Sequence, residues 1–125
     1  MRKPSVSERP SSPIPEPAQR LRIYLGERDH QGGQPLYTAI VHAARTAGIA
    51  GATVLKGIEG YGGHSVVHAA RIVDLAADLP IVVELVDAPA AIAAFLPIVT
   101  AMLGGGLVTL EDLSIVYRST GKRPA

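Results

Sequence analysis

The sequence contains no cysteine, and aromatic residues make up only 4% of its 125 residues. Without cysteine, the chain has no disulfide, no zinc thiolate site and no cysteine nucleophile. Without many large rings, its core must be built from alanine, valine, leucine and isoleucine, within a hydrophobic content of 47%. A chain free of cysteine fits a cytoplasmic protein, because disulfides belong to oxidising compartments.

Net charge is also scarce, at +1, so there is no electrostatic reason to expect nucleic acid or an anionic membrane surface as a partner. Arg2 and Lys3 are followed by serine and proline rather than by the apolar run of a signal peptide. The most apolar window, residues 90–103, is shorter than the ~20 residues that a membrane-spanning helix needs, and it contains Pro97. The sequence therefore predicts a soluble, cytoplasmic protein.

Motifs for catalysis are missing as well. There is no G-x-S-x-G turn to present a serine nucleophile. The acidic residues form no spaced pair suited to general acid and base catalysis. We therefore expect no enzymatic activity, and a small enzyme that uses one of these acids is the weaker alternative. The acids considered are Glu27, Asp29, Glu59, Asp74, Asp78, Glu84, Asp87, Glu111 and Asp112.

The length is that of one domain. Residues 1–19 interleave five prolines with four serines. Such a segment cannot bury enough apolar surface to offset its ordering entropy, which predicts a disordered tail. The domain is expected over residues 20–118, and residues 119–125 are expected to form a polar C-terminal tail.

Two expected elements open the domain. Leu21, Ile23 and Leu25 alternate with less apolar residues, as in a half-buried strand. A polar loop over residues 27–34 leads to Pro35, which suits the first turn of a helix. That helix carries an apolar face and ends at Gly48. The apolar face consists of Leu36, Ile40, Ala43, Ala44 and Ala47.

Four further segments follow. Residues 52–59 read as a strand, residues 60–68 as a connection, and residues 69–77 give no clear structure. Residues 79–86 are rich in β-branched residues and predict a strand. Asp87 is expected as the N-cap of a second helix, which Pro97 should bend and three glycines end. A last strand is expected over residues 107–117, in one piece or in two around Glu111 and Asp112. The stripe of the second helix consists of Ile92, Phe95, Leu96, Val99, Met102 and Leu103.

The order strand, helix, strand, strand, helix, strand predicts an α+β, ferredoxin-like βαββαβ domain, with both helices on one face of an antiparallel sheet. Residues 79–86 are apolar on both faces, and such strands are normally covered on both sides. Because no third helix is available, a second copy of the chain is the simplest cover. Glu84 would then need a partner, and Arg22 is expected to provide it.

Several segments in order carry a resemblance to a known family. GIAGATV followed by EGYGG, together with LRIYLGE, DLPIVVELVD and GLVTLED, resembles family 190 of the domains of unknown function, a group of PII-like proteins. The resemblance covers residues 21–118. It implies a homotrimer whose sheets face inward and whose clefts between subunits bind a small-molecule effector, an adenine nucleotide. It also implies a loop, here residues 60–68, that signals to a partner such as a membrane transporter or channel.

The resemblance also implies the ligand-binding residues. The root of the signalling loop falls at Gly60, Tyr61 and Gly62, flanked by Glu59, and Tyr61 would either stack on an adenine or cap the sheet. Lys56 is placed at the end of its strand, where it could neutralise phosphate. The remaining candidates are the loop after the second helix, Gly104, Gly105 and Gly106, and the arginine of the final motif, Arg118.

Two features qualify this site. The three glycines would serve equally as a helix end and turn. Leu107 and Val116 stand where PII proteins carry cations, so a monophosphate, diphosphate or cyclic nucleotide is expected rather than ATP. No resident cofactor is implied.

A metal-ion-responsive trimer of the same fold is the alternative function. His64 and His68 lie four residues apart, a spacing that binds metals when both share a helix face. No third ligand lies near them in the sequence. Two solvent-exposed histidines are therefore expected, with no metal site.

Overall fold

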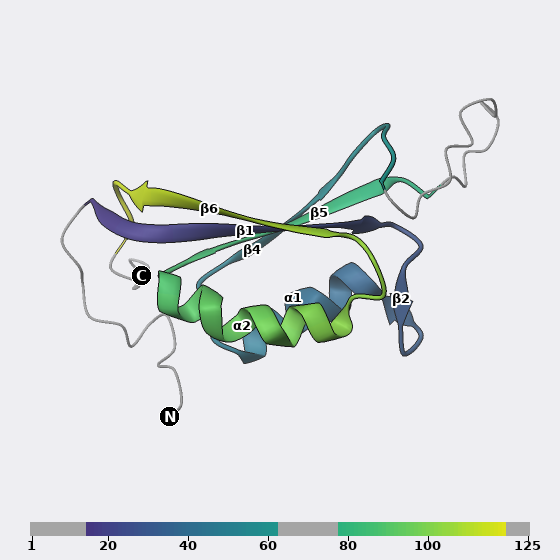
Figure 1. Cartoon of the computed structure of the whole chain (residues 1–125), viewed down its shortest axis with the longest axis horizontal. Coiled ribbons are helices and arrows are strands. Elements are labelled where there is room, and N and C mark those ends of the chain that lie inside the picture. The colour runs from purple at the N-terminus through teal and green to yellow at the C-terminus, as the bar shows by residue number, and fades with distance from the viewer. Residues whose placement is uncertain (1–14, 63–77, 120–125) are drawn as a thin grey trace, which may run out of the picture.

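The computed structural model describes residues 15–62 and 78–119. They form a four-stranded sheet with two helices below it (Figure 1). A two-residue hairpin, β2 and β3, pairs across Gly32 and Gly33 within the predicted polar loop. The elements are β1 (Glu16–Gly26), β2 (His30–Gln31), β3 (Gln34–Pro35), α1 (Leu36–Thr46), β4 (Ala52–Lys56), β5 (Pro80–Asp87), α2 (Pro89–Met102) and β6 (Leu107–Ile115).

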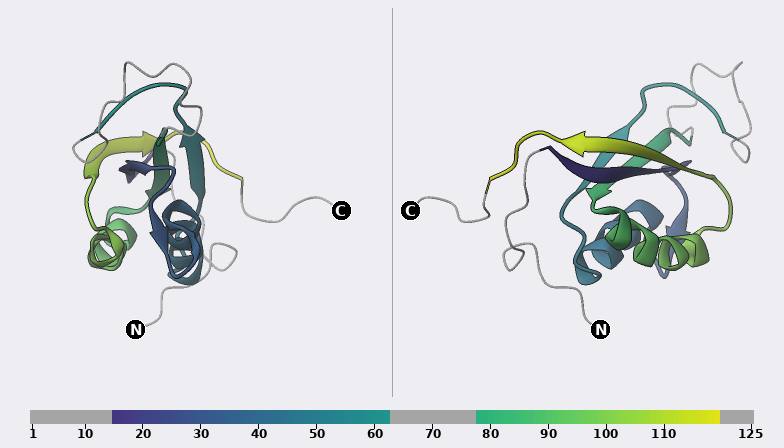
Figure 2. Two further views of the ribbon diagram at one scale, coloured as in Figure 1. Left: turned by 90° about the vertical axis from the view of Figure 1, so that its right-hand side faces the viewer. Right: turned by 60° about the vertical axis from the view of Figure 1, so that its left-hand side comes forward.

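The strands of the main sheet lie in the order β4-β5-β1-β6, and each neighbouring pair is antiparallel. Figure 2 shows both helices packed against the same face. Apart from the small hairpin, the order of elements is the predicted one. The ferredoxin-like βαββαβ fold is therefore confirmed.

The core lies between the sheet and the helices and consists of apolar side chains, with Asp87 buried on the same face at the end of β5. Alternate residues of β1 and β5 point into it, so Ile23 lies opposite Val83 and both are fully buried. Ile40 of α1 and Phe95 of α2 cover them and are buried as deeply. The predicted apolar faces of both helices are thereby confirmed.

Both predicted helix boundaries differ from the structure at the N-terminal side. Pro35 is the N-cap of α1 rather than a first-turn residue. Asp87 is not the N-cap of α2, because Ala88 holds that position without a side-chain cap. Asp87 instead ends β5 on the buried face, where its Oδ2 accepts a hydrogen bond from Ala50 N at 3.0 Å and its Oδ1 accepts one from Ala88 N at 2.7 Å. Gly48, with φ +80°, ends α1 as predicted.

Strand boundaries also needed correction. β1 begins at Glu16, inside the predicted tail, because the antiparallel pairing with β6 continues to Ile115. Residues 1–14 and 120–125 lie outside the described residues. β4 ends at Lys56 rather than at residue 59, since Gly57 N donates to Pro80 O and the chain then leaves the sheet. β6 is one strand that runs through Glu111 and ends at Ile115.

The second face of the sheet is open. In the described part of the chain, no element covers it (Figure 2). Leu55 of β4 and Leu107 of β6 are 48% and 58% exposed there, and Val82 is half-buried between them. Neither helix of the described residues is long and apolar enough to cross a membrane.

Candidate functional site

Two glycine segments lie at the same end of the sheet, next to its two opposite edge strands, β4 and β6. We call this the glycine end and define it by residues 56–62 and 104–106. β4 reaches this end at Lys56, which pairs with Ile81, and β6 leaves it at Leu107, which pairs with Tyr24. β1 ends and β5 begins between them (Figure 1). The fold therefore places the root of the loop after β4 and the loop after α2 at the same end of the sheet, with β5 and β1 between them.

The root of the loop after β4 packs closely on the start of β5. A Cβ on Gly57 would lie 2.6 Å from Pro80 Cγ, and one on Gly60, where φ is +152°, would lie 3.2 Å from the same atom. Only glycine permits this approach without a shift. The sequence analysis missed Gly57, because its role depends on a strand that follows a long connection.

The loop after α2 combines a structural glycine with an open one. Gly106 has φ +118°, and a Cβ there would lie 2.5 Å from Tyr24 O, so this glycine serves the turn itself. No heavy atom lies within 4 Å of a Cβ placed on Gly104. Gly105 between them is half-buried. Gly104 is thus the position where a phosphate can approach the backbone unobstructed.

Lys56 forms an ion pair at the glycine end. Its Nζ lies 2.7 Å from Glu27 Oε2, and the two side chains are 53% and 33% exposed. Glu27 follows β1, two strands away from β4 in the sheet. No local pattern in the sequence predicts this ion pair, because the two residues come together only when the sheet has formed.

The aromatic candidate lies free of the sheet. Tyr61 is 74% exposed and Ile58 is 95% exposed, and Glu59 and Gly62 are exposed with them. Tyr61 therefore does not cap the sheet, which leaves its ring available for stacking. Ile58 lies beyond the end of β4.

Arg118 lies at the opposite end of the sheet. Its Nε is 3.3 Å from Oε1 of Glu16, the first residue of β1. The 11 residues of β1 separate that end from the glycine end by about 33 Å at the usual rise of a strand. Within one chain, Arg118 therefore cannot act on a ligand bound beside Lys56. The sequence analysis also missed Glu16, which it placed in the tail.

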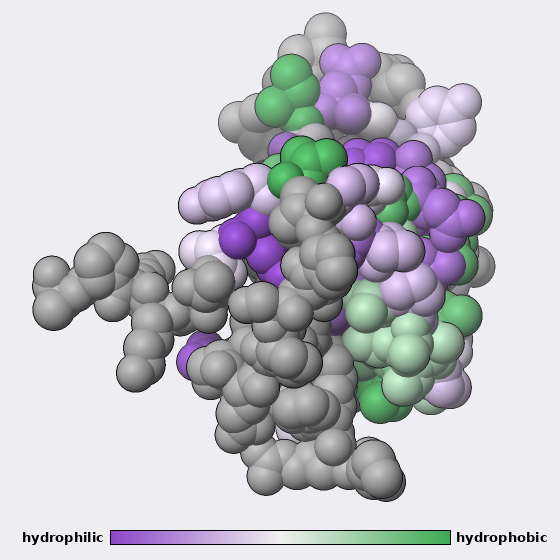
Figure 3. Space-filling model, turned by 90° about the vertical axis from the view of Figure 1, so that its left-hand side faces the viewer, coloured by the Kyte–Doolittle hydropathy of each residue, from purple (hydrophilic) through white to green (hydrophobic). Residues whose placement is uncertain are grey.

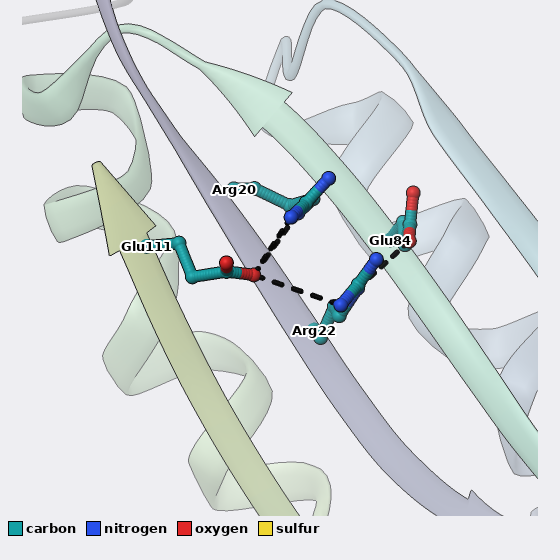
Figure 4. A network of polar contacts seen from close by, with 4 residues as sticks. All are labelled: Arg20, Arg22, Glu84 and Glu111. Atoms are coloured by element: carbon teal, nitrogen blue, oxygen red, sulfur yellow. Dashed lines mark hydrogen bonds and ion pairs between the residues drawn. The ribbon is translucent and has the colours of Figure 1, made fainter. Parts of the chain in front are cut away.

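The open face carries a paired charge network (Figure 4). Arg22 Nε donates to Glu84 Oε2 at 2.8 Å, which confirms the predicted partner of Glu84. Arg20 and Arg22 both reach Glu111 Oε1, at 2.9 Å and 3.6 Å. The hydrogen bond to Glu84 raises the pKa of Arg22, so this guanidinium stays charged. These charges satisfy one another and leave no cation free for a phosphate.

The predicted metal ligands of the alternative function, His64 and His68, lie outside the described residues. Within residues 15–62 and 78–119, no three histidine or acidic side chains are grouped closely enough to hold a metal ion. The metal alternative gains no support from this part of the chain.

Comparison with known proteins identifies the family. The profile of family DUF190, described as "Uncharacterized ACR, COG1993", matches residues 18–115. The chain belongs to this family. A UPF0166 protein of Aquifex aeolicus is 35% identical over 97 residues, which cover 78% of this chain and 91% of that protein. A UPF0166 protein of Methanocaldococcus jannaschii is 36% identical over 104 residues, which cover 82% of this chain and 95% of the relative.

Solved structures show the wider fold to which the family belongs. CPII of Thiomonas intermedia K12, a nitrogen regulatory PII-like protein bound to ADP, AMP and bicarbonate, aligns with a TM-score of 0.54 at 18% identity. The alignment covers 82% of this chain and 91% of CPII. The family is therefore PII-like in fold, as the resemblance implied.

Proposed function

We propose that this chain is a PII-like regulatory protein, without enzymatic activity, that binds an adenine nucleotide at the glycine end. The placement of both glycine segments at one end of the sheet carries the proposal. Gly104 offers open backbone, Lys56 a cation and Tyr61 an exposed ring. The glycine end could thus supply a backbone contact to a phosphate, a cation to neutralise it and an aromatic ring to stack on the adenine base.

The proposed site lies between the subunits of a homotrimer. One chain leaves its open sheet face uncovered in the described residues, and all five residues of the edge strand β4 are exposed. Arg118 lies at the far end from Lys56, so it can join the site only if it comes from another copy of the chain. CPII, which shares the fold, binds ADP and AMP in its solved structure. Nucleotide binding at a subunit boundary fits all three observations.

Signalling is proposed to pass through residues 60–68, of which residues 63–68 lie outside the described part. Gly60 and Pro80 fix the root of this connection. For binding to become a signal, the nucleotide must bind two conformations of the loop with different affinity. A membrane transporter or channel is the proposed class of partner.

A methyl group on the open glycines tests the nucleotide site. Gly104→Ala and Gly62→Ala each place a Cβ that has no contact within 4 Å among residues 15–62 and 78–119, apart from its chain neighbours, and neither position has a positive φ. Because the methyl would occupy space beside the ligand, we expect the affinity for ADP and AMP in calorimetry to fall at least about tenfold, or about 1.4 kcal/mol.

Gly51→Ala is the matched control. Its Cβ is equally unobstructed, but Gly51 precedes β4 at the other end of that strand. We expect this variant to bind as the wild type does. Equal weakening by all three substitutions, or wild-type protein that binds zinc but no adenine nucleotide, would contradict the proposal.

The assembly is tested separately by light scattering. We expect a mass of three chains at micromolar concentration. A stable monomer under these conditions would refute the shared site, because Arg118 could not then reach the glycine end.

A further inference from the structure

The Lys56–Glu27 ion pair limits which phosphate groups the glycine end can accept. Among the proposed ligand residues at this end, Lys56 is the cation, and its Nζ already lies 2.7 Å from a carboxylate oxygen. A phosphate that reaches Lys56 must displace Glu27 or share the lysine with it. Either way, the carboxylate offsets the positive charge that Lys56 can offer to a phosphate.

Hydrogen bonds hold the backbone around Glu27. Three consecutive backbone N–H groups around it are bonded: Gly26 N to Asp29 Oδ2 at 3.0 Å, Glu27 N to Leu79 O at 2.8 Å, and Arg28 N to Asp78 Oδ1 at 2.8 Å. Exposed ion pairs are usually weak, partly because two mobile side chains must be ordered. The bonded backbone fixes the point from which the Glu27 side chain extends to Lys56.

The charges around the pair act in the same direction. Among the lysine, arginine, aspartate and glutamate residues of the described segments that adjoin the strands at this end, two are cations and four are carboxylates. Each further phosphate charge therefore enters a field that is negative on balance. The cations are Lys56 and Arg28, and the carboxylates are Glu27, Asp29, Glu59 and Asp78.

The second candidate cation repeats the arrangement. Arg118 is paired with Glu16, whose side chain is only 14% exposed. A copy of the chain that brought Arg118 to the glycine end would bring Glu16 with it. Both proposed phosphate-binding cations are thus neutralised by a glutamate at an end of β1.

We propose that Glu27 is a specificity-determining residue, which makes the nucleotide site prefer a monophosphate or cyclic nucleotide to a triphosphate by occupying Lys56. This inference rests on the proposed nucleotide site. It assigns the effector to the class of adenine nucleotides with low phosphate charge.

Calorimetry with AMP, ADP and ATP at one ionic strength tests the inference on the full chain. We expect the wild type to bind AMP most tightly and ATP most weakly. Glu27→Gln keeps the side-chain size but removes its charge, and we expect it to improve ATP binding relative to AMP about fivefold, the effect of one unit charge at about 4 Å in water.

Two controls separate charge at Lys56 from other effects. Asp112→Asn removes an exposed carboxylate that pairs with Gln19 near the other end of β1, outside the proposed site, and it should change the ATP to AMP ratio less than twofold. In a Lys56→Met background, Glu27→Gln should lose its effect on that ratio. Circular dichroism checks that each variant is folded.

The outcomes distinguish the two proposals. If the wild type binds nucleotides but Glu27→Gln leaves the ratio unchanged, or if the effect persists without Lys56, the role of Glu27 is refuted and the nucleotide site stands. If the wild type binds none of the three nucleotides, the proposed function and this inference both fail.

Discussion

At the scale of single residues, Gly106 marks the closest backbone approach at the glycine end. Its φ of +118° lies where side chains are strained, and a Cβ would meet Tyr24 O at 2.5 Å. Because the obstacle is a backbone oxygen inside a strand, it cannot move aside cheaply. Gly106 is therefore required by the turn, whereas Gly104 has open space beside it. The sequence pattern does not distinguish the two glycines.

Gly106→Ala should lower the free energy of unfolding by at least about 2 kcal/mol, from backbone strain and steric contact together. Urea unfolding measures the change. Gly104→Ala is the matched control and should lie within about 0.5 kcal/mol of the wild type, since no heavy atom lies within 4 Å of its Cβ. Equal stability of the two variants would show that the turn at Gly106 relaxes freely.

At the scale of elements, Asp87 joins β5 to the segment that follows α1. It is 2% exposed, and its two carboxylate oxygens accept hydrogen bonds from Ala50 N and Ala88 N. Buried backbone donors need such partners. Asp87 therefore secures the start of β4 against the end of β5, which a helix cap would not do.

Asp87→Ala should lower the free energy of unfolding by about 1–3 kcal/mol, because it removes a buried carboxylate that accepts hydrogen bonds from two backbone N–H groups. Chemical denaturation followed by circular dichroism checks this. Asp112→Ala is the control: that carboxylate accepts one exposed hydrogen bond from Gln19, and its loss should cost no more than about 0.5 kcal/mol. A similar cost for both would indicate that burial of Asp87 contributes nothing.

The second helix differs from the first in its exposed side. α2 has no charged residue, and Ile98 is 45% exposed on it. Figure 3, viewed from the Arg118 end, shows hydrophobic residues over the helix layer at the lower right and hydrophilic residues over the sheet. The sequence stripe predicted the buried side of α2 correctly, because apolar residues at helical spacing turn to the core.

At the scale of the whole molecule, the open face combines apolar residues with a self-paired charge network. Arg22 and Glu84 lie 2.8 Å apart with about a third and a fifth of their side chains exposed. In the proposed trimer this face would be covered, and paired charges tolerate burial far better than single ones. The network thus suits an interface between copies of this chain.

Glu84→Ala should therefore weaken the assembly, because it leaves Arg22 without its closest partner on a covered face. Light scattering over a dilution series should show dissociation at a higher protein concentration than for the wild type. The double substitution Arg22→Met, Glu84→Leu removes both charges and should restore association. If the double variant dissociates as readily as the single one, the pair does not lie in an interface.

The ionisation of Arg22 adds no pH dependence near neutrality. The raised pKa of Arg22 means that its contribution is fully present below the ordinary arginine pKa and is lost only as the pH rises through the raised value. We expect the assembly measured by light scattering to be insensitive to the ionisation of Arg22 from pH 6 to pH 9, which are ordinary working values well below about 12.

The sequence by itself determined the order of elements and the buried faces. The alternation of Leu21, Ile23 and Leu25, the β-branched run of β5 and the stripe of α2 are local periodic signals, and apolar burial follows such periods directly. The same patterning placed Arg22 and Glu84 on one face. Gly48, with a positive φ at the end of α1, was equally readable.

Only the tertiary structure decided which side chains neutralise the candidate cations and where the glycines are obligatory. Glu27 forms an ion pair with Lys56, and Glu16 forms one with Arg118; in both cases the partners lie far apart in the sequence. The start of β1 at Glu16 depends on pairing with β6, and the role of Asp87 depends on Ala50. The pairing register and the ion pairs between strands involve residues far apart in the sequence, so no short segment of sequence predicts them. Once the sheet is formed, the length of β1 alone separates Arg118 from the glycine end.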